Sequence, residues 1–403
     1  MSYREIKACR ICGNDNLIEV LDLGMQELTG VFPENLQQEV TSGPLKLVKC
    51  HGNDVCHLLQ LQHSYDLDEM YGDNYGYRSG LNQSMVRHLG EKVAKILQRI
   101  ELRSGDLVID IGSNDGTTLG FYPRGDWDLA GIDPTAEKFR EYYKDYLHLL
   151  PDFFSAETFG AAFGDRKARV VTSFSMFYDL EDPLDFAQTV SDILADDGVW
   201  VLEQSYMPEM LKQDSYDTVC HEHLEYYGLS QIDWITRQVG LKILDVEFND
   251  VNGGSFSVTL AKENSDHQPD LSCIASILED ERPYRDIAPY LEFAERVEVS
   301  RQRLRNNLES IWEAGKTVYG IGASTKGNVI LQYCGIDTDL LPRIGEVNSE
   351  KYGKFTPGSR IPIVSEDEVL ALAPDYLLVL PWHFRRFFEA SERFRQTQLI
   401  YPL

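Results

Sequence analysis

The chain has 403 residues, 43% of them hydrophobic, and carries 38 Lys and Arg against 65 Asp and Glu. The resulting formal net charge of −27 repels phosphate backbones and anionic bilayers, so we expect no nucleic-acid partner and no membrane partner. At roughly one domain per 150 residues, the length predicts two or three domains, while the composition leaves the oligomeric state open. No apolar run of about 18 residues occurs, and the N-terminus lacks the apolar stretch of a signal peptide, which predicts a cytoplasmic protein.

Four of the seven cysteines form two short pairs near the N-terminus. The first pair reads CRIC and the second CHGNDVC, and in a reducing cytosol such pairs favour a metal site over disulfides. We predict a structural zinc site with four protein ligands, because a segment of about 60 residues is too small to be stabilised by its apolar core alone. The wide second pair leaves room for His51 or His57 to replace a cysteine, and free buried thiols are the alternative. The predicted ligands are Cys9, Cys12, Cys50 and Cys56.

A strand, a glycine loop and a helix are predicted from Asp106, where the chain reads DLVIDIGSNDGTTLGF. Asp110 lies at the end of the strand, where open α/β sheets bind their ligands. About twenty residues further on, LAGIDPT predicts a second strand that ends in Asp133, placed to accept hydrogen bonds from ribose hydroxyls. This spacing indicates a ligand that contains adenosine, and an ordinary turn between a strand and a helix is the alternative.

The glycine loop lacks the G-x-G-x-x-G pattern that seats a pyrophosphate, and it offers acidic residues where phosphates would lie. S-adenosylmethionine, which is cationic and has no phosphate, therefore fits this loop better. Three further segments, LLPDFF, ARVVTSFSMF and DDGVWVLEQSY, continue the sheet, and Phe153 either stacks on the adenine or belongs to the core. The predicted cofactor contacts are Asp110, Gly112, Ser113, Asn114, Gly116, Asp133, Pro134, Asp152, Phe153 and Ser175.

The segment DTVCHEHLEYYGLS, residues 217–230, gathers two histidines, three carboxylates and two tyrosines. Such a cluster can bind a metal, move a proton or form the polar start of a helix. We exclude a metal centre at HEH, because histidines two positions apart do not share one face of a helix.

The last third of the chain predicts a second α/β unit. Residues 262–285 are polar and contain two prolines, which predicts a loop at a domain junction. KTVYGIGASTKGNVILQYC then predicts a strand, a glycine loop and a helix whose amides and lysine suit a diphosphate, although an ordinary loop with an exposed lysine is the alternative. PDYLLVLPW predicts a late buried strand. A long amphipathic helix between domains is predicted over residues 289–313, with apolar positions Tyr290, Leu291, Val297, Leu304, Leu308 and Ile311.

Several motifs occur in one order along nearly the whole chain: CRIC, DLG followed by LTGVFPE, a cysteine before LLQL, VIDIGSNDGT, HEHLEYYGL, GGSF, YGIGASTKGN and PGSRIPI. This order resembles the nucleotide-sugar C-methyltransferase family, whose members methylate carbon 3 of nucleotide-linked 4-keto-deoxyhexoses in branched-chain sugar biosynthesis. The resemblance implies an α/β protein with a zinc-binding domain (1–75), a class I methyltransferase Rossmann-like domain (76–262) and a C-terminal Rossmann-like domain (263–403) that helps to hold the nucleotide sugar.

The resemblance also assigns chemistry to the histidine cluster. Methylation of a carbon next to a ketone requires removal of its proton and support for the enolate oxygen. An imidazole with a pKa near 6.5 is largely neutral at working pH and can accept that proton, and the family's base maps to His223, with Glu222 beside it. Where the family often has a tyrosine this chain has Cys220, so either Tyr226 or Tyr227 compensates, with Tyr227 as the predicted third catalytic residue, or the acceptor differs.

The family's substrate contacts map to the GGS turn and to the C-terminal glycine loop. Two other functions remain open: a keto-sugar epimerase or isomerase that uses the same base, and a non-catalytic binding protein. The nucleotide base, the sugar epimer and the product stereochemistry are also open. The predicted substrate contacts are Asn252, Gly254, Ser255, Gly322, Ala323, Ser324, Thr325, Lys326, Asn328 and Lys351.

Overall fold

The N-terminal part of the chain forms a four-stranded antiparallel sheet whose last strand comes from far along the sequence. The computed structural model describes residues 3–65 and 78–403, and the strand order of this sheet is β11-β4-β3-β2. Two short strands, β1 (Tyr3–Glu5) and β5 (His63–Tyr65), pair with each other. The strands of the four-stranded sheet are β2 (Leu17–Glu27), β3 (Ser42–Cys50), β4 (Leu59–Leu61) and β11 (Glu225–Tyr226). The histidine cluster therefore leads into a strand of the N-terminal sheet.

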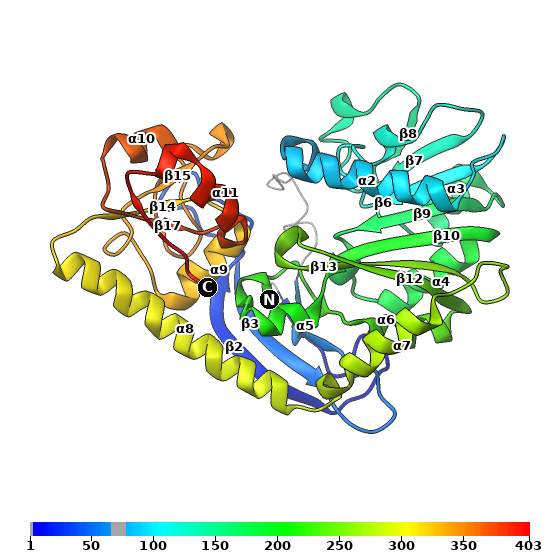
Figure 1. The fold of residues 1–403 in the computed structure, drawn as a ribbon, viewed down its shortest axis with the longest axis horizontal. Coiled ribbons are helices and arrows are strands. Elements are labelled where there is room, and N and C mark those ends of the chain that lie inside the picture. Colours follow the sequence, from blue (N-terminus) through cyan, green and yellow to red (C-terminus); the bar gives the residue numbers. More distant parts are fainter. Residues whose placement is uncertain (1–2, 66–77) are drawn as a thin grey trace.

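The central part is a seven-stranded sheet in the order β12-β13-β10-β9-β6-β7-β8, with helices on both faces (Figure 1). All five residues of β6, LVIDI, are buried, as is typical of a parallel strand covered on both sides. The strands are β6 (Leu107–Ile111), β7 (Asp128–Ile132), β8 (Leu147–Leu150), β9 (Ala168–Phe174), β10 (Leu194–Ser205), β12 (Leu241–Asn249) and β13 (Ser255–Lys262). The helices are α2 (Gln83–Arg99), α3 (Ala156–Phe163), α4 (Pro183–Ile193), α5 (Met207–Lys212), α6 (Leu229–Gln238) and α7 (Leu271–Asp280).

The predicted strands of this sheet are confirmed as β6 to β10, but the helix predicted after the glycine loop is wrong. Gly112, Asn114 and Gly116 all have positive φ angles, of 72°, 49° and 72°, so the chain turns repeatedly instead of entering a helix. Only a short 3-10 helix, Leu119–Phe121, follows before Pro123 ends the segment. The loop consequently stays at the carboxyl edge of the sheet, beside β7.

The C-terminal part is a five-stranded parallel sheet in the order β16-β15-β14-β17-β18, which is 3-2-1-4-5 in chain order within this sheet. This order is that of a Rossmann-like half and confirms the predicted second Rossmann-like unit. The strands are β14 (Val318–Ile321), β15 (Ile344–Glu346), β16 (Ile363–Ser365), β17 (Tyr376–Val379) and β18 (Gln398–Ile400), and the helices are α9 (Thr325–Cys334), α10 (Glu366–Ala371) and α11 (Arg385–Ala390).

The long helix α8 (Ala288–Glu313) confirms the amphipathic helix and joins the parts of the molecule. It contacts β2, α5 and α9, so the N-terminal and C-terminal sheets share one apolar core (Figure 1). Leu291 is 45% exposed and does not belong to the buried face, whereas Phe293 does. The loop predicted over residues 262–285 is also wrong, because α7 packs against β12 and carries the central layer past residue 262.

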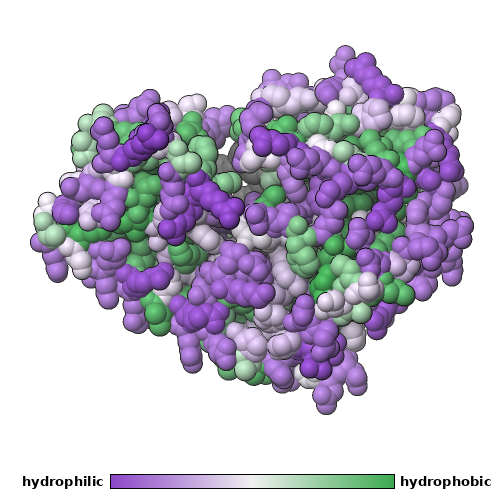
Figure 2. All heavy atoms as spheres, viewed as in Figure 1, coloured by the Kyte–Doolittle hydropathy of each residue, from purple (hydrophilic) through white to green (hydrophobic). Residues whose placement is uncertain are grey.

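The surface is largely hydrophilic on the face shown in Figure 2, and it is hollowed between the central part and the C-terminal part. The remaining regular elements of the described residues are short. Among residues 3–65 and 78–403, no helix has the length and apolarity that spanning a bilayer requires. The 3-10 helices are Ser79–Leu81, Leu119–Phe121, Arg140–Tyr142, Phe177–Asp179, Tyr216–Thr218, Val251–Gly253, Arg282–Arg285, Ser349–Lys351, Trp382–Phe384 and Glu392–Phe394.

Candidate active site

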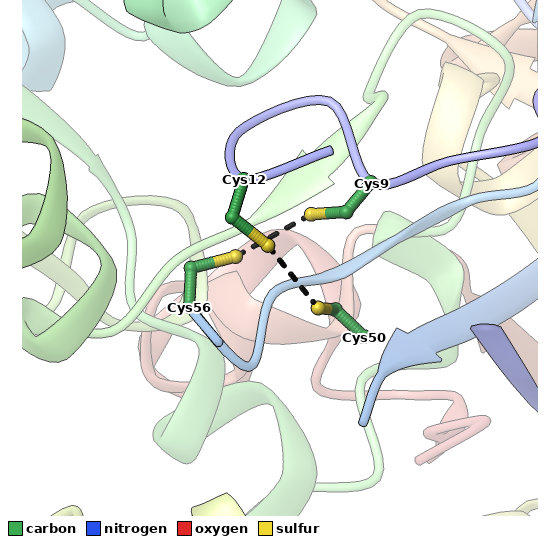
Figure 3. Close-up of side chains that lie close together, drawn as sticks. All are labelled: Cys9, Cys12, Cys50 and Cys56. Carbon is green, nitrogen blue, oxygen red and sulfur yellow. Dashed lines mark hydrogen bonds between the residues drawn. The ribbon is translucent and has the colours of Figure 1, made fainter. Parts of the chain in front are cut away.

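The four N-terminal cysteines converge on one point (Figure 3). Two of them come from the first zinc knuckle, CRIC, and two from the second zinc knuckle, CHGNDVC. The Sγ atoms of Cys9 and Cys56 are 3.4 Å apart, those of Cys12 and Cys50 are 3.5 Å apart, and all four lie within 4.8 Å of one another. These separations are too long for disulfides, whereas Zn–S bonds of about 2.3 Å place tetrahedral sulfur ligands about 3.8 Å apart. The cluster therefore fits a tetrahedral zinc ion.

Neither neighbouring histidine is needed to complete this ligand set. The metal-ligand cluster found in the described part of the chain consists of the four cysteines alone. The backbone of His57 has a φ of 59°, and burial lowers the pKa of its imidazole to about 4. Asn14 donates from Nδ2 to Cys50 Sγ at 3.3 Å, a bond that supports a thiolate at that position.

A cavity of about 220 Å³ lies at the carboxyl ends of β6, β7 and β9, where the cofactor site was predicted. The sequence missed Thr135, Phe154 and Met176, which follow the predicted residues by one or two positions and also line the cavity. Eight of the ten predicted cofactor residues line it: Asp110, Gly112, Ser113, Asn114, Asp133, Pro134, Phe153 and Ser175.

The carboxylates of this cavity are held by the loop around them. Asp133 accepts hydrogen bonds from the Asn114 amide at 2.7 Å and from the Thr135 amide at 2.7 Å, so its position is fixed by backbone groups. Asp110 accepts a hydrogen bond from Thr172 Oγ1 at 2.5 Å, and burial raises the pKa of Asp110 to about 7. Gly112 must be glycine, because a Cβ there would lie 2.9 Å from Met176 and φ is positive. The site presents hydrogen-bond acceptors, which suits ribose hydroxyls and a cationic ligand.

Two predicted cofactor residues do not line the cavity. Gly116 lies against the ring of Tyr143 and serves the turn, and Asp152 accepts a hydrogen bond from the Phe153 amide at 2.8 Å. Asp115, the acid that was expected to repel phosphates, turns toward the Gly80 amide, to which its carboxylate lies at 2.9 Å. The preference for a phosphate-free ligand therefore comes from Asp110 and Asp133 and not from the acid within the loop.

The HEH segment forms a turn instead of the start of a helix. A 3-10 helix, Tyr216–Thr218, precedes it and β11 follows it, because Glu225 and Tyr226 pair with β4. His221 is fully buried, and its ring meets Tyr65 edge-on at 4.7 Å inside the N-terminal part, which gives it a structural position. The two histidines consequently point to different surroundings.

His223 has the arrangement of a proton acceptor. Its Nδ1 lies 2.9 Å from the carbonyl oxygen of Thr218, and since a carbonyl can only accept, Nδ1 carries the proton and Nε2 keeps its lone pair. Burial and the ammonium of Lys326 lower the pKa of His223 to about 4, so the imidazole is neutral at neutral pH. Its ring contacts Tyr178 at 4.3 Å, and the next residue, Asp179, lines the cofactor cavity. His223 therefore lies beside the cofactor site.

Glu222 is half-buried and lies between the N-terminal part and the C-terminal glycine loop. A Cβ built on Gly30 would lie 2.8 Å from Glu222 Oε1 and 4.0 Å from Thr325 Oγ1, so only glycine allows this approach. Burial raises the pKa of the Glu222 carboxyl, and Oε2 has no hydrogen-bond partner within the described residues. Cys220 is also buried, which raises the pKa of its thiol well above the ordinary value.

The structure does not bring Tyr227 to His223. Tyr227 packs against the ring of Phe177 at 5.3 Å, and its nearest charged groups belong to Glu225 and the cysteine cluster. Tyr226 instead lines a small cavity of about 10 Å³ together with His223, and its hydroxyl lies 3.4 Å from the Thr218 carbonyl. Of the two tyrosines, Tyr226 is therefore the one that lies beside His223.

Lys326 lies between the histidine turn and the cleft that separates the two Rossmann-like parts. Its Nζ donates to the Asn252 carbonyl at 3.0 Å, and its charge lowers the pKa of both His223 and His383. Ser324 caps α9 by accepting from the Gly327 amide at 3.0 Å, so this helix begins directly at the loop. The predicted GGS turn and glycine loop thus meet at Lys326.

Three other predicted substrate residues hold the loop in place. Asn328 is buried and donates to the Thr29 carbonyl at 2.8 Å, and Lys351 donates to the Ala323 carbonyl at 2.7 Å and lies over the ring of Phe32. Gly322 has a φ of 82°, and a Cβ there would meet Pro381 at 2.6 Å. Asn328 and Lys351 therefore attach the N-terminal part to the C-terminal sheet, whereas Gly322 packs within the C-terminal part.

A larger cavity, of about 950 Å³, lies between the central and C-terminal parts beside Lys326. The predicted Gly254 and Ser255 line it from one side. The sequence analysis missed the other side, although the run WHFRRFF directly after β17 places aromatic and cationic side chains at the carboxyl edge of a parallel sheet. The lining residues from this run are Trp382, His383, Phe384, Arg385, Arg386 and Phe387.

Comparison with known proteins places these features in one family. Family models match residues 9–71 (a candidate zinc binding domain), 85–246 (a methyltransferase domain) and 250–403 (a C-methyltransferase C-terminal domain). The chain is 33% identical over 388 residues to the C-methyltransferase NovU of Streptomyces niveus, an alignment that covers 94% of this chain and 91% of NovU.

Two solved methyltransferase structures show a more distant likeness. Magnesium protoporphyrin IX methyltransferase ChlM from Synechocystis PCC 6803 with bound SAH has a TM-score of 0.34 and 15% identity, covering 49% of this chain and 92% of that chain. The plantazolicin methyltransferase BpumL in complex with SAH has a TM-score of 0.36 and 13% identity, covering 46% and 87%. The identity to NovU and the three domain models, in the expected order, show that the chain belongs to the C-methyltransferase family and is an S-adenosylmethionine-dependent methyltransferase.

Proposed function

We propose that the protein methylates carbon 3 of a nucleoside diphosphate 4-keto-6-deoxyhexose through an enolate, as a step of branched-chain deoxysugar biosynthesis. The observation that carries this proposal is the neutral imidazole of His223, whose Nδ1 is engaged by the Thr218 carbonyl and which lies between the cofactor cavity and Lys326. A proton acceptor next to a methyl-donor site is what alkylation of a carbon beside a ketone requires.

In this proposal His223 removes the proton from carbon 3 with Nε2. When bound, S-adenosylmethionine supplies an electrophilic methyl group on a sulfonium centre. The low pKa of His223, about 4, keeps the ring unprotonated before the reaction. Burial and the charge of Lys326 disfavour formation of an imidazolium at His223, so the substrate's developing enolate charge must offset this cost.

Lys326 is the proposed cation for the enolate or the adjoining diphosphate. It is the charge that acts on both His223 and His383, so a substrate bound next to it reaches the base on one side and the large cleft on the other. The amides at the start of α9 add favourable dipoles for an anion. Arg386 and the aromatic side chains of the WHFRRFF run suit the nucleotide end, because they offer a fork of donors and flat apolar faces.

Glu222 is proposed to act in its protonated form. Burial raises its pKa, and an unpartnered Oε2 in a buried carboxyl can donate a hydrogen bond to an oxygen that gains charge. Tyr226 takes the place proposed earlier for Tyr227, since Tyr226 lines the His223 cavity.

The zinc ion is proposed to have a structural role. Four cysteine ligands fill a tetrahedral site and leave no position for water or substrate, which is typical of structural zinc. Reduced thiols at such a site fit the cytoplasm.

A decisive test incubates the purified enzyme and S-adenosylmethionine with a panel of 4-keto-6-deoxy sugar nucleotides and analyses the products by mass spectrometry. The proposal predicts a gain of one methylene, assigned to carbon 3 by NMR, for at least one member. An isomerised product of unchanged mass would favour an epimerase that uses the same base, and an unchanged panel with no cofactor binding would favour a binding protein. A methylated carbon other than carbon 3 would overturn the regiochemistry and leave the class of reaction intact.

A further inference from the structure

We propose that Arg10, which stands between the zinc ligands Cys9 and Cys12, positions the His223 turn against the cofactor cavity. The inference rests on the proposed role of His223 as the base. Arg10 belongs to a knuckle far from both Rossmann-like sheets in sequence, yet its side chain is only 3% exposed. A buried guanidinium needs hydrogen bonds and opposite charges around it, so its surroundings show what it holds.

The donors of Arg10 are held by the strands that follow the second knuckle. Nη1 donates to the Leu61 carbonyl at 2.6 Å, Nη2 donates to Ser64 Oγ at 2.9 Å, and the Arg10 amide donates to Gln60 Oε1 at 3.1 Å. These bonds fix the plane of the guanidinium. Its Nε edge then faces two carboxylates, those of Glu225 at 3.6 Å and Glu181 at 3.9 Å.

Glu225 connects Arg10 to the base. It is the second residue after His223, its side chain is 0% exposed, and it lines the same small cavity as His223. Its backbone is locked on both sides, because β11 pairs with Gln60 and the Leu224 amide donates to the Tyr178 carbonyl at 2.8 Å. Burial raises the pKa of the Glu225 carboxyl well above its ordinary value, and the charge of Arg10 is the largest interaction that opposes this rise.

Glu181 connects the same guanidinium to the cofactor cavity. Glu181 lines that cavity, and Ser64 donates to it at 2.8 Å while Arg4 donates at 3.2 Å. The segment before it includes Tyr178, whose ring contacts His223. Arg10 thus lies where the first zinc knuckle, the turn that carries His223 and the Glu181 side of the cofactor cavity meet. The two flanking zinc ligands, Cys9 and Cys12, fix the backbone that carries it.

Without this charge, the buried Glu225 carboxyl loses the ion-pair partner at 3.6 Å that holds it in place, and it should move. Such a movement shifts β11 and with it His223. A displacement of about 1 Å at a reacting group can lower a rate by ~10²-fold, while Asp133 of the cofactor loop is held by the amides of Asn114 and Thr135 and not by Arg10. The expected defect is therefore in kcat and not in cofactor affinity.

The test compares Arg10→Met, Arg10→Lys, the double variant Arg10→Met/Glu225→Gln and the control Arg4→Met. Arg4 also bonds to Glu181, but its side chain is 74% exposed, so it separates loss of a Glu181 partner from loss of the buried charge. We expect Arg10→Met to lower kcat by ~10- to 100-fold, with zinc content and S-adenosylmethionine affinity within about twofold of wild type. Arg10→Lys loses less, the double variant regains at least part of kcat, and Arg4→Met is unchanged.

A readout without sugar substrate separates this inference from the proposed function. In histidine-labelled protein, the ring signals of His223, assigned with a His223→Gln variant, should move in Arg10→Met and return toward their wild-type positions in the double variant. If wild type methylates no sugar but these signals behave as described, the proposed function fails and the positioning role stands. An Arg10→Met enzyme with kcat within twofold of wild type, unmoved His223 signals, or a double variant that stays inactive or fails to fold would overturn the inference.

Discussion

The two Rossmann-like sheets of this molecule use the same loop position for opposite charges. In each, the first strand of the unit, β6 or β14, ends in a loop with positive-φ glycine, and the next strand, β7 or β15, ends in an acid, Asp133 or Glu346. The central loop then turns without forming an α-helix and surrounds two carboxylates. The C-terminal loop enters α9 at once and places Lys326 in the first turn.

The difference lies in which groups the loop presents. The central loop offers Asp110 and Asp133, acceptors for hydroxyls and for a positive ligand. The C-terminal loop offers the positive dipole end of a helix and an ammonium, which favour an anion. Strand order alone therefore does not tell which ligand such a sheet binds. His223, the proposed base, lies between the two loops, where the proposed reaction brings a methyl donor and an anionic acceptor together.

The largest expected effect comes from replacing His223, which lies between the two loops. His223→Gln keeps a polar side chain and removes the base, so kcat for methyl transfer should fall by ~10³-fold, within the range for a lost general base. Cofactor affinity should stay within twofold of wild type when measured by calorimetry. His267→Gln, at a histidine that bonds only to the Asp197 carbonyl, is the matched control and should be unchanged.

Asp133→Asn tests the central loop. The carboxylate accepts two backbone amides and is placed for the ribose hydroxyls, so its loss should weaken S-adenosylmethionine binding by ~10- to 100-fold, the size of charge-assisted hydrogen bonds. Calorimetry should show unchanged affinity for a nucleoside diphosphate. Asp128→Asn, at the other end of β7, serves as the control. Equal affinity of Asp133→Asn and wild type for the cofactor would contradict the assignment.

Lys326→Glu tests the C-terminal loop, and here we expect nucleotide affinity to fall while cofactor affinity stays the same. A carboxylate in place of the ammonium should weaken nucleoside diphosphate binding by about tenfold or more, and the loss should shrink at high salt. Cofactor binding should not change. Lys316→Glu, at the exposed position just before β14, controls for net charge. If Lys326→Glu binds the nucleotide as wild type does, the anion must bind elsewhere in the cleft.

Three histidines predict one part of how stability depends on pH. Burial lowers the pKa of His221 and His223 to about 4 and that of His383 to about 3, whereas in the unfolded chain the pKa is about 6.5. Between these values the unfolded chain binds more protons at these rings, so their contribution to the free energy of unfolding should fall as the pH drops from about 6.5 toward 4, while the raised pKa values of Asp110 and Glu222 act in the opposite direction. Urea unfolding of wild type and His223→Gln at pH 7 and pH 5 isolates the contribution of one ring, and an equal change with pH in both proteins would argue against a neutral imidazole at position 223.

Phe153→Ala should have the smallest effect. The ring lines the cofactor cavity but is 44% exposed, so loss of its stacking should weaken S-adenosylmethionine binding only a few-fold, consistent with about 0.5–1.5 kcal/mol for an aromatic contact. The nucleotide affinity of this variant should equal that of wild type. A loss as large as that of Asp133→Asn would mean that Phe153 is more than a partial cover of the adenine.

Much of the fold was predictable because its signals are local. The apolar runs in LVIDI and LAGIDPT predicted β6 and β7, eight of the ten residues predicted to contact the cofactor line one cavity, and the four cysteines of CRIC and CHGNDVC lie together. The helix α7 was also within reach of the sequence, since Ile274 and Ile277 recur at helical spacing after the capping residue Asp270. The two prolines nearby concealed this pattern.

The shape of the turn that carries His223 was not predictable from local signals. HEHLEYY reads as the start of a helix, but β11 forms because Glu225 and Tyr226 pair with Gln60 and Leu59, far away in the chain. That pairing decides that Tyr226 and not Tyr227 faces His223. The cleft beside Lys326 also depends on two distant segments, the GGS turn and the run after β17, which only the tertiary fold brings together.

Hydrogen exchange at carbon 3 of the keto sugar nucleotide tests the central claim most directly. The wild-type enzyme, saturated with S-adenosylhomocysteine so that no methyl group is available, is incubated with the substrate in deuterated water, and NMR follows the carbon 3 signal. We predict that wild type exchanges this hydrogen for deuterium at a rate comparable to methyl transfer and that His223→Gln exchanges at least ~10²-fold more slowly. Exchange at the wild-type rate in His223→Gln would contradict the assignment of the base.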